Sequence, residues 1–328
     1  MKKKKKKWKL VIAFIVFELL FTVVTAPFIL LYGPFDTAKR IYVGSAMTTF
    51  RHKYLATAFL SQEKINEILN SGSKSDTVKG NNGSTVDITG THDNTIDLYK
   101  FENSKYTGYM LVIKNPKRIK IAYTNSLYKK GETTSQMAIQ NNAVAAINGG
   151  AFVDTSSSAN WTGNGGTPSG VIISDGKVIF SDLKPGESTT CMAMDAQGKL
   201  HVGSFTLQQL KDMGTTQAVS FGPVLIKNGK PLDLTGMSAS WGLAPRTAIG
   251  QRADGSIVMM VVDGRSIVNG LGASITELQS LMLTKGKCVN AINLDGGKSS
   301  TMYLDGKIIN NLSNGLGERY IASAVVVK

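Results

Sequence analysis

Four Asp-Gly or Asn-Gly pairs lie between short apolar, β-branched runs, and they constrain the fold more than any other feature of this sequence. They occur in VIISDGKVIF, VLIKNGKPL, IGQRADGSIVMMVVDGR and MYLDGKIIN. These pairs favour the tight turns of β-hairpins, because both positions tolerate positive φ. Helical patterns are fewer, the clearest being SITELQSLMLTK at residues 274–285. The sequence therefore predicts an α+β fold with a mixed, largely antiparallel sheet and few helices, and not a doubly wound nucleotide fold.

The N-terminal segment is of a different kind. Seven lysines lie within the first nine residues, and residues 10–32 are uncharged apart from Glu18. A helix of this length crosses a bilayer, and the basic flank places the N-terminus in the cytoplasm and the remainder outside. The alternative is a cleaved signal peptide, which normally has a shorter apolar region; Pro27 also disfavours the best cleavage site. We expect an uncleaved, single-pass anchor in the cell membrane.

The net charge of +14 depends strongly on that lysine run. The remainder is mildly basic and has no dense Arg/Lys stripe interleaved with aromatic residues, which argues against nucleic-acid binding. Such a surface favours anionic polymers such as phosphate-rich envelope glycans. Cys191 and Cys288 are too few for a disulfide framework or a Cys-rich zinc site; they either pair or remain buried thiols.

Composition divides the chain into three parts. Residues 47–70 carry apolar residues at helical spacing, with Ser61 as N-cap and Gly72 as stop, and predict a membrane-proximal helical stalk. Residues 71–94 are rich in Gly, Ser, Asn, Thr and Asp and predict a flexible linker. The expected parts are a Lys-rich tail and transmembrane anchor (1–33), a stalk and linker (34–94), and a catalytic-sized domain (95–328).

The densest functional motif is NLDGGKSSTM, residues 293–302, which comes directly after a strand-like run at 288–292. Asp-Gly-Gly allows a sharp turn with exposed N–H groups, a concavity that binds anions with Asp295 at its edge. The alternative is an ordinary turn between two strands. A P-loop is excluded, because Ile292 stands where that motif requires Gly.

Further candidates lie at the ends of predicted strands. Arg246 begins a strand in APRTAIG, and its guanidinium matches a phosphate bidentately; the alternative is a surface or structural ion pair. Asp263 ends the strand at 257–262. Asn148 offers a donor and an acceptor where AAINGGAF breaks. The Gly-rich stretch at 160–170 is either a mobile loop over a site or passive.

Glu277 and the three histidines give weaker evidence for catalysis. Glu277 completes the capping box Ser274-x-x-Glu277, so we place a structural role ahead of a catalytic one. His52, His92 and His201 form no Ser-His-acid pattern or zinc motif. We therefore expect no histidine chemistry.

Five motifs occur in a characteristic order: NGGAF (148–152), SFGPVLIKNGK (220–230), PRTAIG (245–250), VDGR (262–265) and NLDGGKSSTM (293–302). This series resembles the phosphodiester glycosidase family, relatives of the mannose 6-phosphate uncovering enzyme whose bacterial members are often called exopolysaccharide biosynthesis proteins. The resemblance covers residues 97–328. Lys298 departs from it, because the family usually carries a third Gly there.

The resemblance implies hydrolysis of sugar-1-phosphodiesters at the glycosidic bond. The catalytic candidates are Asp295, as general base or nucleophile, Asp263 as second carboxylate, Arg246 on the phosphate, and Glu277. The substrate-binding candidates are Asn148, Gly149, Asn293, Gly296, Gly297, Ser299, Ser300 and Thr301, with the backbone of 296–300 on the phosphate. No cofactor or metal is expected. The alternatives are a non-catalytic glycan-binding or assembly protein, and a hydrolase acting on another phosphodiester such as a teichoic-acid linkage.

Overall fold

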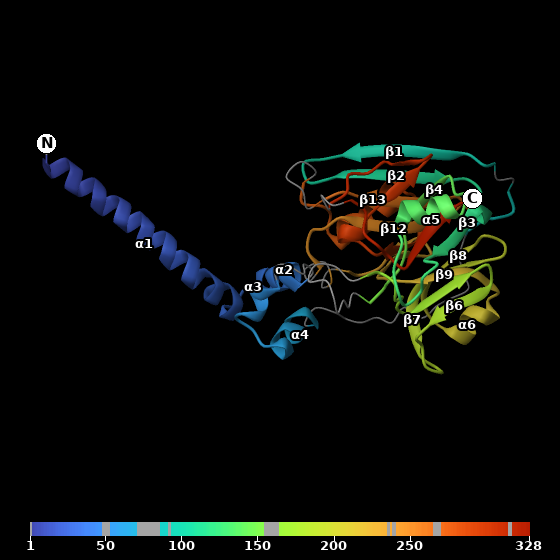
Figure 1. Ribbon diagram of the computed structural model, residues 1–328, viewed down its shortest axis with the longest axis horizontal. Coiled ribbons are helices and arrows are strands. Elements are labelled where there is room, and N and C mark those ends of the chain that lie inside the picture. The colour runs from blue at the N-terminus through green and yellow to red at the C-terminus, as the bar shows by residue number, and fades with distance from the viewer. Residues whose placement is uncertain are drawn as a thin grey trace. The chain divides into compact units, whose positions relative to one another are not determined.

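The computed structural model describes residues 2–47, 53–70, 86–90, 93–153, 164–234, 237, 241–264, 270–313 and 317–328 (Figure 1). The chain falls into two compact units, residues 1–73 with 239–242 and residues 74–238 with 243–328. Most of the predicted linker, and residues 160–163 of the predicted loop, lie outside the described residues. Asp87, which the sequence assigns to the linker, is part of the second unit, and its N–H donates to the carbonyl of Ala253 at 2.8 Å.

The first unit is helical. It contains α1 (Lys2–Tyr32), α2 (Asp36–Met47), α3 (Tyr54–Thr57) and α4 (Gln62–Asn70). Residues 8–32 of α1 are long and apolar enough to cross a membrane. The buried side chains of this unit, Leu31, Val43, Ala46, Ala56, Leu60, Ile65 and Ile68, form one cluster. Ser61 is confirmed as an N-cap, since its hydroxyl accepts from Lys64 N at 3.2 Å.

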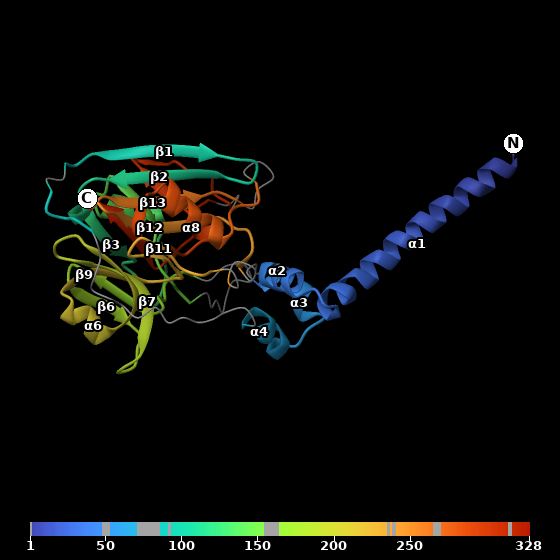
Figure 2. The same cartoon turned by 180° about the vertical axis from the view of Figure 1, so that it is seen from behind.

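The second unit contains three sheets (Figures 1 and 2). The seven-stranded sheet has the order β1 (Ile96–Glu102), β2 (Thr107–Ile113), β13 (Ile257–Val262), β12 (Arg246–Arg252), β14 (Cys288–Leu294), β10 (Val224–Lys227) and β11 (Lys230–Pro231). A five-stranded sheet has the order β16 (Lys307–Ile308), β15 (Met302–Leu304), β4 (Ala145–Asn148), β17 (Ser323–Val327) and β3 (Ile119–Tyr123). The other has the order β6 (Lys177–Ser181), β5 (Val171–Ser174), β9 (Thr215–Ser220), β7 (Ser188–Asp195) and β8 (Leu200–Thr206).

Helices are few in this unit, as the sequence predicts. Among the described residues they are α5 (Thr134–Gln140), α6 (Leu207–Asp212) and α8 (Ile275–Thr284), with 3-10 turns η1 (Pro116–Arg118) and η2 (Gly297–Ser299). Helix α8 packs on β10, β12 and β14, and Figure 2 shows it beside β12. Every strand pairing in the described residues is antiparallel, for example β12 with β13 and β14. The predicted α+β class is therefore confirmed.

One apolar core joins the three sheets. Ile249 and Leu294 enter it from the seven-stranded sheet, Ile147 from the second sheet, and Ile172 and Met192 from the third. Because successive side chains of a strand point to opposite faces, Thr247 and Ile249 leave β12 on one side and Arg246 and Ala248 on the other. Because of this alternation, Thr247 and Arg246 contact different neighbours.

The predicted hairpins are present. Asp175-Gly176, Asn228-Gly229 and Asp305-Gly306 adopt φ values of 46° and 76°, 50° and 76°, and 46° and 83°. Positive φ at both positions is the type I′ pattern that suits the twist of paired strands. In the fourth hairpin, only Gly255 of the Asp254-Gly255 pair has positive φ, at 83°.

The two cysteines are unpaired. Cys191 and Cys288 are both buried free thiols. Burial raises the pKa of each thiol to about 12, against a smaller opposing effect of Arg252 on Cys288. Both are therefore packing residues with little thiolate character.

Candidate active site

A buried polar network lies where β4, β12 and β14 end. Asn148, the last residue of β4, is fully buried. Its Nδ2 donates to the carbonyl of Asp295 at 2.6 Å, and its Oδ1 accepts from Thr247 Oγ1 at 2.8 Å and from Thr301 N at 3.1 Å. One amide therefore holds the backbone on both sides of the Gly-Gly turn. Asn148 acts on the position of Asp295.

The network continues to Asp263. Thr247 Oγ1 lies 3.3 Å from Ser300 Oγ, and the Ser300 carbonyl accepts from Asn310 Nδ2 at 3.2 Å. The same Nδ2 lies 3.0 Å from Asp263 Oδ1. Four motifs that are distant in sequence thus meet beneath Asp295, and their meeting is a consequence of the fold.

Asp263 is enclosed by amides. It is 1% exposed, and its Oδ2 accepts from Asn311 N at 3.0 Å and Asn311 Nδ2 at 3.1 Å. Burial raises the pKa of this carboxyl, against the opposing hydrogen bonds from Asn310 and Asn311. In this arrangement Asp263 secures residues 310–311 to the end of β13. A role as second catalytic carboxylate stays a prediction.

Arg246 and Asp295 are neighbours on adjacent strands. The pairing of β12 with β14 runs as far as Thr247 opposite Leu294, and the next residues are Arg246 and Asp295. The chains remain together beyond this point, because Gly297 N donates to the Pro245 carbonyl at 2.9 Å. Arg246 is 5% exposed, and its Nε donates to the Ala273 carbonyl at 3.0 Å. Arg246 and Asp295 therefore come directly after the last paired residues of these two strands, and the Nε edge of the guanidinium is used inside the protein.

The turn after Asp295 is held by its own hydrogen bonds. Gly296 N donates to Asp295 Oδ1 at 2.9 Å, Ser299 N to the Gly296 carbonyl at 3.2 Å, and Ser300 N to the Gly297 carbonyl at 3.2 Å. With Gly297 N on Pro245, four N–H groups donate within the protein. Two of these bonds close the 3-10 turn, one reaches the Asp295 carboxylate and one reaches Pro245, so these four groups already have acceptors within the protein. A role of this turn in binding substrate stays a prediction.

A pocket of about 150 Å³ opens beside this turn. Its lining residues are Ala151, Phe152, Phe221, Asp295 and Arg319. The Arg319 guanidinium lies over the Phe152 ring, 4.9 Å from its centroid. The pocket therefore combines a carboxylate, a cation and two aromatic walls. Asp295 is the predicted site residue that lines it.

Arg319 is not among the residues predicted from the sequence, although contacts of its neighbours in the chain fix its position. The Glu318 carboxylate accepts from Ser135 N at 3.0 Å and from the Ser135 hydroxyl, at the start of α5. Ile321 and Glu132 exchange backbone hydrogen bonds of 3.0 and 3.1 Å. These contacts fix the residues on both sides of Arg319. No local motif in a single sequence marks such a residue, because its partners lie far away along the chain.

Glu277 has the structural role that we preferred. Its Oε2 accepts from Ser274 N at 2.9 Å, while Ser274 Oγ accepts from Glu277 N at 3.1 Å, so the capping box of α8 is confirmed. Its Oε1 lies 2.9 Å from Lys105 Nζ. Burial alone would raise the pKa of Glu277, but the hydrogen bonds from Lys105 and Ser274 outweigh it and lower the pKa. Glu277 does not line the Asp295 pocket.

The remaining candidates support the backbone. Gly149 N donates to the Ser323 carbonyl at 2.9 Å, and its own carbonyl accepts from Asp295 N at 3.1 Å. Asn293 Nδ2 donates to the Gly222 carbonyl at 2.8 Å. Ser299 Oγ and Asn293 Oδ1 are buried without a hydrogen-bond partner among the described residues. In the same part of the chain, no three His, Cys, Asp or Glu side chains are grouped to hold a metal ion.

Solved structures show the same architecture. The catalytic domain of zebrafish N-acetylglucosamine-1-phosphodiester alpha-N-acetylglucosaminidase, auto-inhibited by its pro-peptide, matches with a TM-score of 0.59 and 19% identity, over 76% of this chain and 88% of that one. A putative exported protein from Burkholderia pseudomallei matches with a TM-score of 0.53 and 18% identity, over 68% and 74% of the two chains. The fold is thus of the class that includes a glycosidase catalytic domain.

The sequence assigns the family. The phosphodiester glycosidase family matches residues 141–328, more than half of the chain, and this protein belongs to that family. The SPbeta prophage-derived uncharacterized protein YomE of Bacillus subtilis is 34% identical over 205 residues, 60% of this chain and 29% of that protein. Mouse N-acetylglucosamine-1-phosphodiester alpha-N-acetylglucosaminidase is 25% identical over 196 residues, 55% of this chain and 35% of that enzyme. The chain thus aligns with 29% and 35% of these two relatives' lengths.

Proposed function

We propose that this protein is a membrane-anchored extracellular hydrolase that cleaves the glycosidic bond of sugar-1-phosphodiesters in cell-envelope glycans. One observation carries the proposal: Asp295, from the most distinctive motif, lines the same small pocket as the Arg319 guanidinium. Membership of the phosphodiester glycosidase family supports it, as do the names of the animal relatives, which specify an N-acetylglucosamine-1-phosphodiester.

The pocket suits the chemistry of this bond. Cleavage releases a phosphate monoester, which is already a stable anion, so proton donation to the leaving group matters less than for an ordinary glycoside. The site must bind the phosphate and stabilise an oxocarbenium-like transition state. In our proposal the Arg319 guanidinium pairs with two phosphate oxygens. Asp295 attacks the anomeric carbon or activates a water molecule there.

The other residues supply position and environment. Phe152 and Phe221 offer apolar surfaces for a sugar ring, and they exclude water, which strengthens the charge interactions beside them. Asn148 and Gly149 hold the Asp295 backbone through their bonds to its carbonyl and N–H. Arg246, on the adjacent strand, adds positive charge near the phosphate.

The N-terminal helix supports the membrane part of the proposal. Its apolar stretch comes directly after the lysine run, an order that retains the N-terminus in the cytoplasm and exports the rest of the chain. The description of the Burkholderia neighbour as an exported protein agrees with an extracellular second unit.

The test is turnover by the full chain in detergent, with a panel of sugar-1-phosphodiesters and analysis of both products. The wild type should release free sugar and a phosphate monoester, and Asp295→Asn should lose at least about a hundredfold in kcat. Lys184→Ala, which removes an exposed cation outside the pocket, is the matched control. Glycan binding without sugar release across the panel would reject the hydrolase and favour the non-catalytic alternative.

A further inference from the structure

A second and larger pocket lies at the opposite end of β9 from the Asp295 pocket. Its volume is about 320 Å³, and Thr216 and Gln217 line it, whereas Phe221, just after β9, lines the Asp295 pocket. At the rise of about 3.3 Å per strand residue, the two pockets are separated by about 13–17 Å along the strand. The volume falls at the lower end of the range for small-molecule sites, about 300–1,000 Å³.

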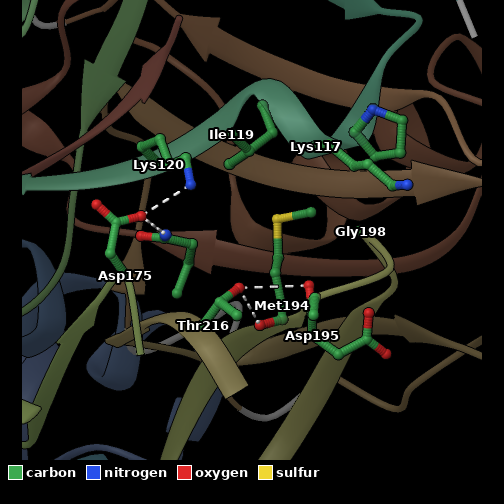
Figure 3. Close-up of a pocket in the computed structure, with 11 residues that line it drawn as sticks. Lys117, Ile119, Lys120, Asp175, Met194, Asp195, Gly198 and Thr216 are labelled. Carbon is green, nitrogen blue, oxygen red and sulfur yellow. Dashed lines mark hydrogen bonds and ion pairs between the residues drawn. The ribbon is translucent and has the colours of Figure 1, made fainter. Parts of the chain in front are cut away.

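Both carboxylates of this pocket already have partners. Asp175 Oδ1 lies 2.8 Å from Lys120 Nζ and accepts from Gln217 Nε2 at 2.8 Å (Figure 3). Asp195 accepts from Gln197 N at 3.0 Å and Lys199 N at 2.9 Å. Its Oδ2 also lies 3.0 Å from His201 Nε2. In Figure 3 the Asp195 carboxylate points away from Asp175 and Lys120. Asp175 is therefore ion-paired, and Asp195 is held by donors outside the Lys117 side chain.

The uncommitted charge in the pocket is positive. Lys117 lines it, and across the described chain its ammonium group makes no hydrogen bond or ion pair. Lys120 also lines the pocket, but its ammonium group is already paired with Asp175 at 2.8 Å. The Lys117 ammonium group, which makes no such pair, favours an anionic ligand.

The walls are held in place before any ligand binds. Gln217 is 1% exposed, and its Oε1 accepts from Ile121 N at 2.8 Å while its Nε2 holds Asp175. Gly198 has a φ of 90°, and a Cβ there would lie 2.9 Å from Pro116 Cγ, so the β7–β8 turn approaches η1 only with glycine at this position. Such preorganisation lowers the entropic cost of binding.

The pocket also has an apolar side. Ile119 and Met194 contribute apolar side chains to its lining (Figure 3). A ring with hydroxyl groups on its edge and C–H groups on its face matches such a surface. The lone pairs of the Asp175 carboxylate, whose side chain is 64% exposed, remain accessible to hydroxyl donors.

We propose that this pocket binds a sugar unit that carries a phosphate or carboxylate group, separately from the Asp295 site. The anionic class follows from Lys117. The choice of a sugar rests on the proposed glycosidase function, whose polymeric substrate would then contact the protein at two points. Lys117 pairs with the anionic group, and Asp175 accepts from sugar hydroxyls.

The test uses the full chain in detergent, with Asp295→Asn to prevent turnover, and hydrogen exchange read by mass spectrometry. The probes are glucose 6-phosphate, glucose and inorganic phosphate. Glucose 6-phosphate should protect the segments 116–120 and 194–198, and more strongly than either other probe. Lys117→Ala should weaken this protection about tenfold in apparent Kd, the loss expected for a charged hydrogen bond. Lys307→Ala, an exposed cation on β16, should leave it unchanged.

Each contrary result has a defined meaning. No protection of these segments, or equal protection in Lys117→Ala, overturns the site. Equal protection by inorganic phosphate overturns the sugar, and equal protection by glucose overturns the anionic class. Failure of the proposed function is distinguishable, because the wild type would then release no sugar while these segments remained protected.

Discussion

Asn148 and Asp295 are 147 residues apart in the chain, yet the Asn148 side chain donates a 2.6 Å hydrogen bond to the Asp295 carbonyl. The acceptor is the backbone, so this contact fixes the main chain from which the Asp295 side chain reaches the pocket. Asn148 is therefore a positioning residue. Its other end is held by Thr247 and Thr301, so the position of Asp295 depends on β4, β12 and the 3-10 turn together.

The Thr247 hydroxyl should be important for stability. Thr247→Val keeps the shape but removes the partner of Asn148 Oδ1 and Ser300 Oγ in a fully buried position. We expect a loss of about 1–3 kcal/mol in the free energy of unfolding, measured by urea titration. Thr284→Val, at an exposed hydroxyl that bonds within α8, should change it by less than about 0.5 kcal/mol. Equal effects of the two substitutions would show that the network contributes little.

Arg319→Lys tests the shape of the guanidinium apart from its charge. Lysine keeps the positive charge but cannot present two parallel donors to a phosphate. We expect kcat/KM for a sugar-1-phosphodiester to fall about 10–100-fold, with the unfolding midpoint unchanged. Lys184→Ala serves again as the control at an exposed cation. Wild-type kinetics in Arg319→Lys would remove bidentate phosphate binding from the mechanism.

Glu277→Gln separates capping from catalysis. Glutamine at this position still completes a capping box, while the charge and the exposed ion pair to Lys105 are lost. We expect a stability change below about 1 kcal/mol and turnover within about twofold of wild type. Ser274→Ala, which removes the cap itself, should cost about 0.5–2 kcal/mol. A large loss of kcat in Glu277→Gln at unchanged stability would instead indicate a catalytic role for Glu277.

Asp195 should stabilise the folded protein near neutral pH, and this contribution should be lost in acid. Burial alone would raise its pKa, but hydrogen bonds from His201 and from the N–H groups of Lys199 and Gln197 outweigh burial and lower it below the ordinary 3.8. The unfolded chain then takes up the proton at a higher pH than the folded one. The stability that Asp195 contributes is therefore present above 3.8 and is lost as the pH falls through the lowered folded value.

The measurement compares wild type with Asp195→Asn in urea unfolding at a series of pH values from neutral to acidic. The gap in the free energy of unfolding should shrink as the pH falls, because the variant lacks the titrating group. A gap that stays constant or widens on acidification would contradict the direction of this pKa shift.

Much of the second unit's fold follows from local patterns. Asp175-Gly176, Asn228-Gly229 and Asp305-Gly306 turn as expected, since positive φ is a property of those residue pairs alone. The strand at 257–262 and helix α8 follow from short-range periodicity and a capping box. The helical segment predicted at 47–70 contains α3 and α4 among its described residues, with Met47 ending α2. The predicted N-cap, Ser61, lies directly before α4 and caps it.

The candidate site was harder to foresee. The order of motifs identified Asp295, Asn148 and Asp263 as members of one region, and the structure joins them through hydrogen bonds. The motifs did not tell which of these residues faces a pocket. Asp263 accepts hydrogen bonds from Asn310 and Asn311, which lie outside the five ordered motifs. Burial is a property of all neighbours together, so it is not encoded at the position itself.

The sequence by itself determined the turns, the helix cap at Ser274, the apolar N-terminal segment and the family. Each of these depends on interactions within a few residues, or on an ordered set of motifs. Only the tertiary structure decided that Arg319 shares a pocket with Asp295, that the N–H of Gly297 donates to Pro245, and that Lys117 and Lys120 line a second pocket with Asp175. These relationships arise when antiparallel strands distant in sequence pair at one register, and register is set by the packing of the whole core.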